Sequence, residues 1–265
     1  MKLRLLFTAL ALAMLTATAY AEEDEGGHGG HAGDVEFGYD NLANPTGFDI
    51  EHDEYTTEGY LFFESEMEEL DPFNSGDYSS DEPGFTTASA EGMLVNENDQ
   101  IWLQTLDASA HSSFGVGYVN FYNPVTDSLE AAGRMGIYDN SSSTDDLILS
   151  GGSVESGLNP QFLGLGDDHG DVHDHLIVDL LDDASAPNGA YGLLFTMQAD
   201  FATGDGNMDL DSDPFWIIWN HGMSDDDFDD LALAKFGVSA VPEPTSFCVF
   251  ALGTAALVLR RRKRA

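Results

Sequence analysis

The stretch from residue 190 to 201 constrains the fold most strongly, because apolar and polar side chains alternate along it. A β-strand projects successive side chains to opposite faces, so this alternation predicts a strand with one buried face. Leu194 is the exception on the polar face. The apolar face carries Tyr191, Leu193, Phe195, Met197, Ala199 and Phe201, and the polar face carries Gly192, Thr196, Gln198 and Asp200.

Several further stretches have the composition of strands and are separated by clusters of Gly, Asn, Asp and Ser. Short strands bounded by such turn residues indicate a mainly β domain, which we expect to be an antiparallel β-sandwich or jelly roll. The predicted strands are 58–64, 100–106, 113–122, 172–181, 190–201 and 214–219.

One helix is predicted after the last strand. Ser224 suits the N-cap, and the aspartates 225–227 suit the positive end of the helix dipole. Lys235 falls in the last turn, and Gly237 ends the helix. The apolar stripe should consist of Phe228, Leu231 and Ala232.

The charge of the chain excludes several classes of partner. The stretch 22–243 holds all 48 acidic residues and only two bases, Arg134 and Lys235. Nucleic acids, phosphorylated ligands and anionic lipid surfaces call for clusters of Lys or Arg, so we expect no such partner. Salt or bound cations must screen the self-repulsion. The one cysteine, Cys248, lies outside this stretch, so the domain has no disulfide.

The N-terminal residues have the pattern of a secretion signal. Lys2 and Arg4 are followed by the apolar run 5–15, and a small-x-small motif ends at Ala21. We expect signal peptidase to cut there. The following segment, 22–33, is rich in Gly, acids and His, and we expect it to be disordered.

The C-terminal residues have the pattern of a membrane tail. Residues 245–259 form an uncharged, mostly apolar helix candidate of about 22 Å, short for a hydrocarbon core of about 30 Å. The basic segment 260–265 should stay cytoplasmic. Segments 34–237 and 238–244 are then an acidic, β-rich ectodomain and a linker. The tail's distinctive residues are Pro242, Glu243 and Pro244, then Arg260, Arg261 and Arg262.

This order of a Pro-Glu-Pro motif, a short hydrophobic helix and arginines resembles the PEP-CTERM sorting signal of Gram-negative bacteria. The resemblance covers about the last 25 residues. It implies that an exosortase recognises the tail and processes it during export to the envelope. The same tail is also called an ice-binding protein C-terminal domain, a name that is no evidence of ice binding here.

A second resemblance covers the stretch from 171 to 231. The segments HDH (173–175), PNGAYGLLF (187–195) and DSDPFWIIWN (211–220), with the acidic helix, are similar to uncharacterised secreted PEP-CTERM proteins of planctomycete-like bacteria. The segment DEPGF (81–85) is similar to the same group. This resemblance implies architecture and location, and no activity.

Three histidines, His169, His173 and His175, form a candidate transition-metal site, with zinc as the first candidate. On a strand, His173 and His175 share one face, a spacing that lets both imidazoles reach one ion. The alternative is a solvated polar loop. A cupin would use a similar His-x-His motif followed by an acidic residue. Asp179 stands at about the sequence position of that acid, although cupins normally have Glu there.

A candidate calcium loop precedes the strand 214–219. Oxygen ligands alternate as at the start of an EF-hand, but the Gly and Glu that complete an EF-hand loop are missing, so a solvated loop is the alternative. The candidate ligands are Asp205, Asn207, Asp209, Asp211 and Asp213.

The aromatic residues Trp102, Trp216, Trp219 and Phe215 could stack on carbohydrate or belong to the core. Hydrolase, metalloprotease, P-loop and dinucleotide motifs are absent from the sequence.

Three functions stay open, in this order. The first is a non-enzymatic, structural or adhesive envelope protein bridged by cations, with extracellular polysaccharide as a candidate partner. The second is an extracellular metal-binding protein that uses His28, His31 and the cluster at 169–175. The third is a cupin-like, metal-dependent enzyme.

Overall fold

The computed structural model describes residues 34–51, 55–69, 78–87, 92–139, 146–181, 186–201 and 208–238. The predicted signal peptide, the segment 22–33 and the whole tail from residue 239 lie outside these residues. So do Asp205 and Asn207 of the candidate calcium loop.

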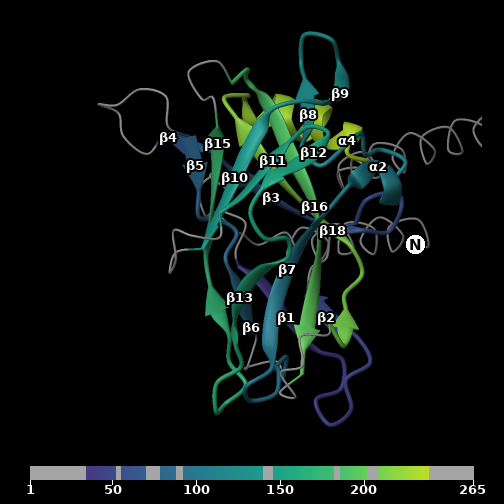
Figure 1. The fold of residues 1–265 in the computed structure, drawn as a ribbon. Helices are drawn as coiled ribbons and strands as arrows, with labels where there is room; N and C mark the ends of the chain where they lie inside the picture. The colour runs from purple at the N-terminus through teal and green to yellow at the C-terminus, as the bar shows by residue number, and fades with distance from the viewer. Residues whose placement is uncertain are drawn as a thin grey trace, which may run out of the picture. The chain divides into compact units, whose positions relative to one another are not determined.

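The described strands form three sheets, so the mainly β prediction is confirmed (Figure 1). The largest has the order β13-β7-β16-β18-β3, with β8, β9 and β17 at its margins. Its strands are β3 (Leu61–Glu66), β7 (Gln100–Leu106), β8 (Asn120–Asn123), β9 (Ser128–Ala131), β13 (Gln161–Leu165), β16 (Gly189–Asp200), β17 (Leu210–Asp211) and β18 (Phe215–His221).

The second sheet has the order β12-β11-β10-β15-β5-β4 and the third the order β14-β6-β1-β2. The second contains β4 (Glu68–Glu69), β5 (Tyr78–Ser80), β10 (Arg134–Asp139), β11 (Leu147–Ser150), β12 (Ser153–Ser156) and β15 (Leu176–Leu181). The third contains β1 (Val35–Tyr39), β2 (Phe48–Glu51), β6 (Phe85–Thr87) and β14 (His173–Asp174).

The antiparallel expectation is wrong for two strand pairs. β1 pairs with β6 in parallel, and β18 pairs with β3 in parallel. A parallel pair needs a long crossover, and each of these pairs joins strands that are far apart in the chain. The other ladders among the described strands are antiparallel.

All three sheets share one hydrophobic core. Side chains from β1, β10 and β16 meet in it, among them Phe37, Ile137 and Phe195, each at most 1% exposed. The odd-numbered residues of β16 face this core, which confirms the predicted apolar face. Burying apolar area in this way is the main favourable term in folding.

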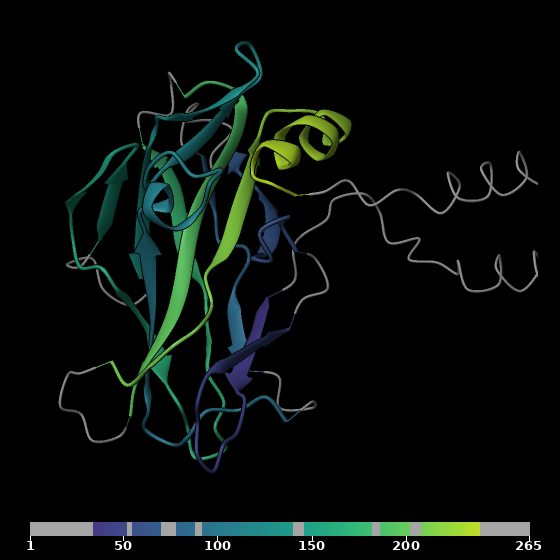
Figure 2. The ribbon, with the colours of Figure 1, turned by 90° about the vertical axis from the view of Figure 1, so that its right-hand side faces the viewer.

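The other face of β16 is buried as well, which the alternation did not predict. Ala190 and Leu194 lie in a second cluster with Trp216 and Ile218 of β18. The helical segment α3 (Asp225–Asp227), η2 (Phe228–Ala232) and α4 (Leu233–Lys235) covers this cluster (Figure 2). Leu194 is therefore a core residue of that second layer.

The late helix is confirmed, but its apolar stripe is shifted. The Ser224 hydroxyl accepts a hydrogen bond from the Asp227 amide at 3.3 Å, as an N-cap does. Residues 228–232 form a π-helix, whose wider turn moves the stripe along the sequence. Leu231 is consequently 45% exposed, whereas Leu233 is 4% exposed.

The predicted strand 113–122 is wrong except at its end. A short helix, α2 (Ala108–His111), precedes it, and β8 begins only at Asn120. The Asn120 side chain accepts from the Val116 amide at 2.7 Å and donates to the Gly117 carbonyl at 3.0 Å. These bonds satisfy the backbone in a turn, in competition with a sheet ladder.

The predicted strand 172–181 is divided between two sheets. β14 pairs with β6 in the third sheet, and β15 pairs with β10 and β5 in the second. The chain changes sheets at His175. Leu176, Val178 and Leu180 face the core, as expected.

Candidate metal centre

Three neighbouring strands of the third sheet bring Asp34, Gly84 and His175 together. Val35 and Asp174 both lie opposite Phe85, so the residue next to each lies beside Gly84. The Val35 amide donates to the Gly84 carbonyl at 2.7 Å, which fixes Asp34 at this place. Gly84 has no side chain, and the flanking side chains converge over it.

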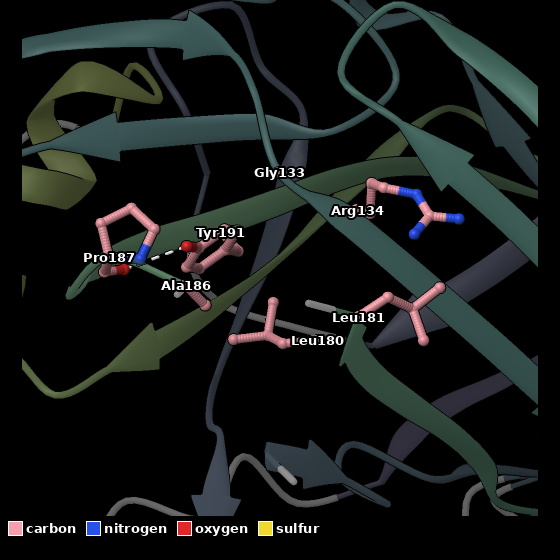
Figure 3. A pocket seen from close by; sticks show the side chains of 7 residues that line it. All are labelled: Gly133, Arg134, Leu180, Leu181, Ala186, Pro187 and Tyr191. Atoms are coloured by element: carbon pink, nitrogen blue, oxygen red, sulfur yellow. Dashed lines mark hydrogen bonds between the residues drawn. The ribbon is translucent and has the colours of Figure 1, made fainter. Parts of the chain in front are cut away.

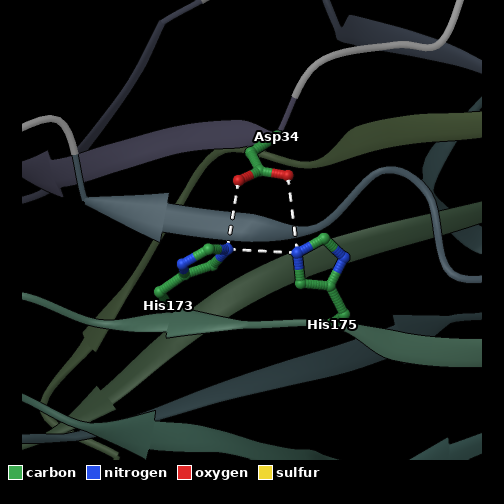
Figure 4. Close-up of side chains that lie close together, drawn as sticks. All are labelled: Asp34, His173 and His175. Atoms are coloured by element: carbon green, nitrogen blue, oxygen red, sulfur yellow. Dashed lines mark hydrogen bonds and ion pairs between the residues drawn. The ribbon is translucent and has the colours of Figure 1, made fainter.

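Asp34, His173 and His175 form a compact triad of ligand atoms (Figure 4). The Nε2 atoms of the two imidazoles are 3.0 Å apart. One Asp34 oxygen lies 3.3 Å from His173 Nε2, and the other lies 3.8 Å from His175 Nε2. The side chains are 26%, 61% and 31% exposed in the order Asp34, His173, His175, so the triad opens to solvent.

A backbone carbonyl orients His175. Its Nδ1 lies 2.9 Å from the Asp81 carbonyl oxygen, which can only accept a hydrogen bond. The Nδ1 atom therefore carries a proton, and in the neutral ring the lone pair is on Nε2, toward the triad. This carbonyl, and then the Asp34 carboxylate, raise the pKa of His175, although partial burial opposes them.

The triad has the dimensions of a metal site. Two ligand atoms about 2.1 Å from a tetrahedral ion lie about 3.4 Å apart. The two Nε2 atoms are 3.0 Å apart, and the Asp34 oxygen nearer to His173 lies 3.3 Å from its Nε2, so both separations are close to that value. Two imidazoles and one carboxylate suit zinc and related divalent ions. Three protein ligands leave at least one coordination position for water or another ligand.

His169 does not lie in this triad. It belongs to a second exposed group with Asp167 and Asp168, where its Nδ1 lies 2.8 Å from an Asp168 oxygen. The Asp167 carboxylate accepts the amides of His169 and Asp171 and so shapes a loop. Asp179, the acid that a cupin site would use, lies on β15 in another sheet.

Two described aspartates of the candidate calcium loop accept hydrogen bonds from β16 or from the residue that follows it. Asp209 accepts the Phe201 amide at 3.0 Å, and Asp211 accepts from the Gln198 side chain at 2.8 Å. In the part of the chain that the structure describes, Asp209, Asp211 and Asp213 join no group of potential metal ligands. Calcium binding by this loop stays a prediction.

The aromatic residues divide into two classes. Phe215, Trp216 and Trp219 are at most 1% exposed and belong to the core. Trp219 also donates its indole N–H to the Glu82 carbonyl at 3.0 Å. Trp102 is half-buried, on the face of the largest sheet that points away from the main core.

A cavity of about 240 Å³ lies elsewhere, between β10, β15 and β16 (Figure 3). The Tyr191 hydroxyl at its wall donates to the Pro187 carbonyl at 3.0 Å. Arg134 is the charged residue of the lining, and it pairs with Glu155 at 2.8 Å. No residue of the triad lines this cavity.

No sequence pattern predicts that Asp34 and Gly84 belong to the site. Asp34 is the first residue of the predicted domain, 139 positions before His173, and Gly84 lies in the segment 81–85, which carries only a resemblance. The pairing of β1, β6 and β14 makes both residues part of the site. No local sequence pattern predicts that pairing, because the three strands are far apart in the chain.

Comparison with known proteins gives one family match. The model of the PEP-CTERM protein-sorting motif matches residues 240–263, which include the Pro-Glu-Pro motif and the three arginines. No curated protein matches the chain. Among the described residues, we find no helix that is long and apolar enough to cross a membrane; the predicted membrane helix 245–259 lies outside them.

One solved structure shows a weak likeness. It is that of CfaE, the adhesive subunit of the CFA/I fimbria of enterotoxigenic Escherichia coli, with 8% identity and a TM-score of 0.23. The likeness covers 63% of this chain and 48% of that one, and at this TM-score it supports no conclusion. The sorting motif does support one: the chain carries a PEP-CTERM protein-sorting motif, which implies export to the cell envelope or surface by way of exosortase.

Proposed function

We propose that this exported protein binds a divalent transition metal, zinc first, through Asp34, His173 and His175. The observation that carries the proposal is the convergence of two imidazole nitrogens and one carboxylate. The two Nε2 atoms are 3.0 Å apart, and each lies within 3.8 Å of an Asp34 oxygen. The Asp81 carbonyl adds the outer-shell hydrogen bond that metal-ligating histidines almost always make.

The test is the zinc content of the purified protein after equilibration with zinc and removal of the excess. We expect one zinc per chain, and little in the variants Asp34→Asn and His173→Ala. The matched control is His169→Ala, which removes an exposed imidazole only a few residues away. If His169→Ala loses zinc and Asp34→Asn keeps it, the ligand set is wrong.

A structural or adhesive role in the envelope is the second candidate, because of the charge. Both bases of the stretch 22–243 pair with acids: Arg134 with Glu155, and Lys235 with Asp127 at 2.9 Å. The remaining acids favour bound cations, and we expect these to bridge copies or polymers. Light scattering with and without millimolar calcium tests this, and equal particle size in both would contradict it.

We propose further features of the tail and the fold. We expect signal peptidase to cut after Ala21, and the helix 245–259 to hold the protein in the membrane until exosortase acts. Truncation after Ser239 should then release soluble protein into the medium, whereas continued retention would refute the sorting role. The three packed sheets support a β-sandwich.

A further inference from the structure

The outer face of the largest sheet carries a row of four side chains from neighbouring strands. Here the outer face means the face opposite the main core. Phe162 lies opposite Trp102, Trp102 opposite Gln198, and Gln198 opposite Asp211, on β13, β7, β16 and β17. Directly paired residues project to the same side of a sheet, so the four form one row of about 14 Å at about 4.8 Å per strand.

The aromatic half of the row offers an apolar platform. Trp102 and Phe162 are both half-buried, and their ring centroids lie 4.9 Å apart in an edge-to-face arrangement. The Trp102 indole nitrogen is buried and has no hydrogen-bond partner among the described residues, so the exposed part of the ring is carbon. Such a surface packs against the C–H face of a sugar ring.

The polar half of the row is held in place by its own hydrogen bonds. The Gln198 side-chain amide donates to Gln104 at 2.9 Å and to Asp211 at 2.8 Å. Both amide protons of Gln198 are thereby used, which leaves the Gln104 amide group and carboxylate oxygens of Asp211 for a ligand. Donors and acceptors beside an aromatic platform match the hydroxyl groups of a sugar.

We propose that this row binds a neutral polysaccharide, with Trp102 as the stacking residue. The negative charge of the protein favours a neutral polymer over an anionic one, because the row carries a carboxylate and the chain has a formal net charge of −39. An anionic polysaccharide would meet repulsion without a compensating cluster of bases. The proposal is independent of the metal centre.

Tryptophan fluorescence of the full chain gives a direct test. Trp216 and Trp219 are buried in the core, so a change on adding dextran, mannan or xyloglucan reports on Trp102. We expect a saturable change with one of these neutral polymers. In native gels that contain the same polymer, Trp102→Ala should lose about tenfold or more in affinity.

Two further variants keep the test decisive if Trp102→Ala is poorly folded. Gln104→Ala removes a half-buried side chain that accepts a hydrogen bond from Gln198 of the row, and it should also weaken retardation in the gel, whereas His173→Ala should not. Absence of retardation by every neutral polymer would overturn the proposal. So would retardation that is unchanged in Gln104→Ala and in folded Trp102→Ala, or stronger retardation by anionic alginate.

Discussion

Replacing Gly84 by alanine should weaken metal binding without unfolding the domain. A Cβ on Gly84 would lie 2.5 Å from Asp34 Oδ1 and 2.5 Å from His175 Cε1. Carbon atoms at optimal contact are about 3.5 Å from their neighbours, so both side chains must retreat by about 1 Å. Gly84 does not have a positive φ, so alanine can adopt its backbone conformation.

The expected magnitude follows from the tolerance of a metal site. Ligand distances hold to within about 0.2 Å, and the displacement of about 1 Å exceeds this several-fold. Disturbing the groups that orient metal ligands costs about 10–100-fold in affinity, or about 1.4–2.7 kcal/mol. The displaced atoms are ends of side chains, so the free energy of unfolding without metal should change by less than about 1 kcal/mol.

The assay is isothermal titration with zinc, together with a thermal melt of each metal-free protein. Gly152→Ala is the matched control, because a Cβ there meets nothing within 4 Å. An unchanged zinc affinity in Gly84→Ala would refute the claim that Asp34 and His175 ligate over Gly84. An equal loss in Gly152→Ala would show that the effect is not local.

Three more predictions follow from the same structure. Zinc affinity should fall as the pH is lowered, because only the neutral imidazole binds zinc. Since the pKa of His175 is raised, zinc titrations at several pH values should show the loss beginning above the ordinary histidine range, and a pH-independent affinity would contradict this. In the helix, Leu233→Ala should lower the free energy of unfolding in urea by about 2–4 kcal/mol, and Leu231→Ala should lower it by less than about 0.5 kcal/mol. The reverse order would show that Leu231, as the sequence predicts, belongs to the apolar stripe. The melting temperature should rise with sodium chloride as salt screens the acidic surface, and a flat dependence would show that self-repulsion is unimportant.

The elements with the clearest local pattern could be predicted from the sequence. The alternation along residues 190–201 predicted β16 and its core face, and the N-cap residue Ser224 predicted the start of the late helix. Burial of Leu194 could not be predicted, since it depends on the helix that folds back over β16. The shift from Leu231 to Leu233 depends on a π-helix, which the spacing of apolar residues does not reveal.

Two of the three residues of the candidate site, His173 and His175, could be predicted from the sequence. The His-x-His spacing predicted that His173 and His175 lie together, and their Nε2 atoms are 3.0 Å apart, although His175 lies just beyond the end of β14. Asp34 joins them only through the parallel pairing of β1 with β6 and the pairing of β6 with β14. His169 is close in sequence, but the turn at Gly170, where φ is +82°, precedes β14, and His169 lies with Asp167 and Asp168.

The most direct test of the metal centre is a crystal of the protein grown with zinc and measured at the zinc absorption edge. We expect one strong anomalous peak within about 2.0–2.2 Å of His173 Nε2, His175 Nε2 and an Asp34 oxygen. A peak bound by His169, or no peak near His173 and His175 in a crystal that contains zinc elsewhere, would contradict the proposed function.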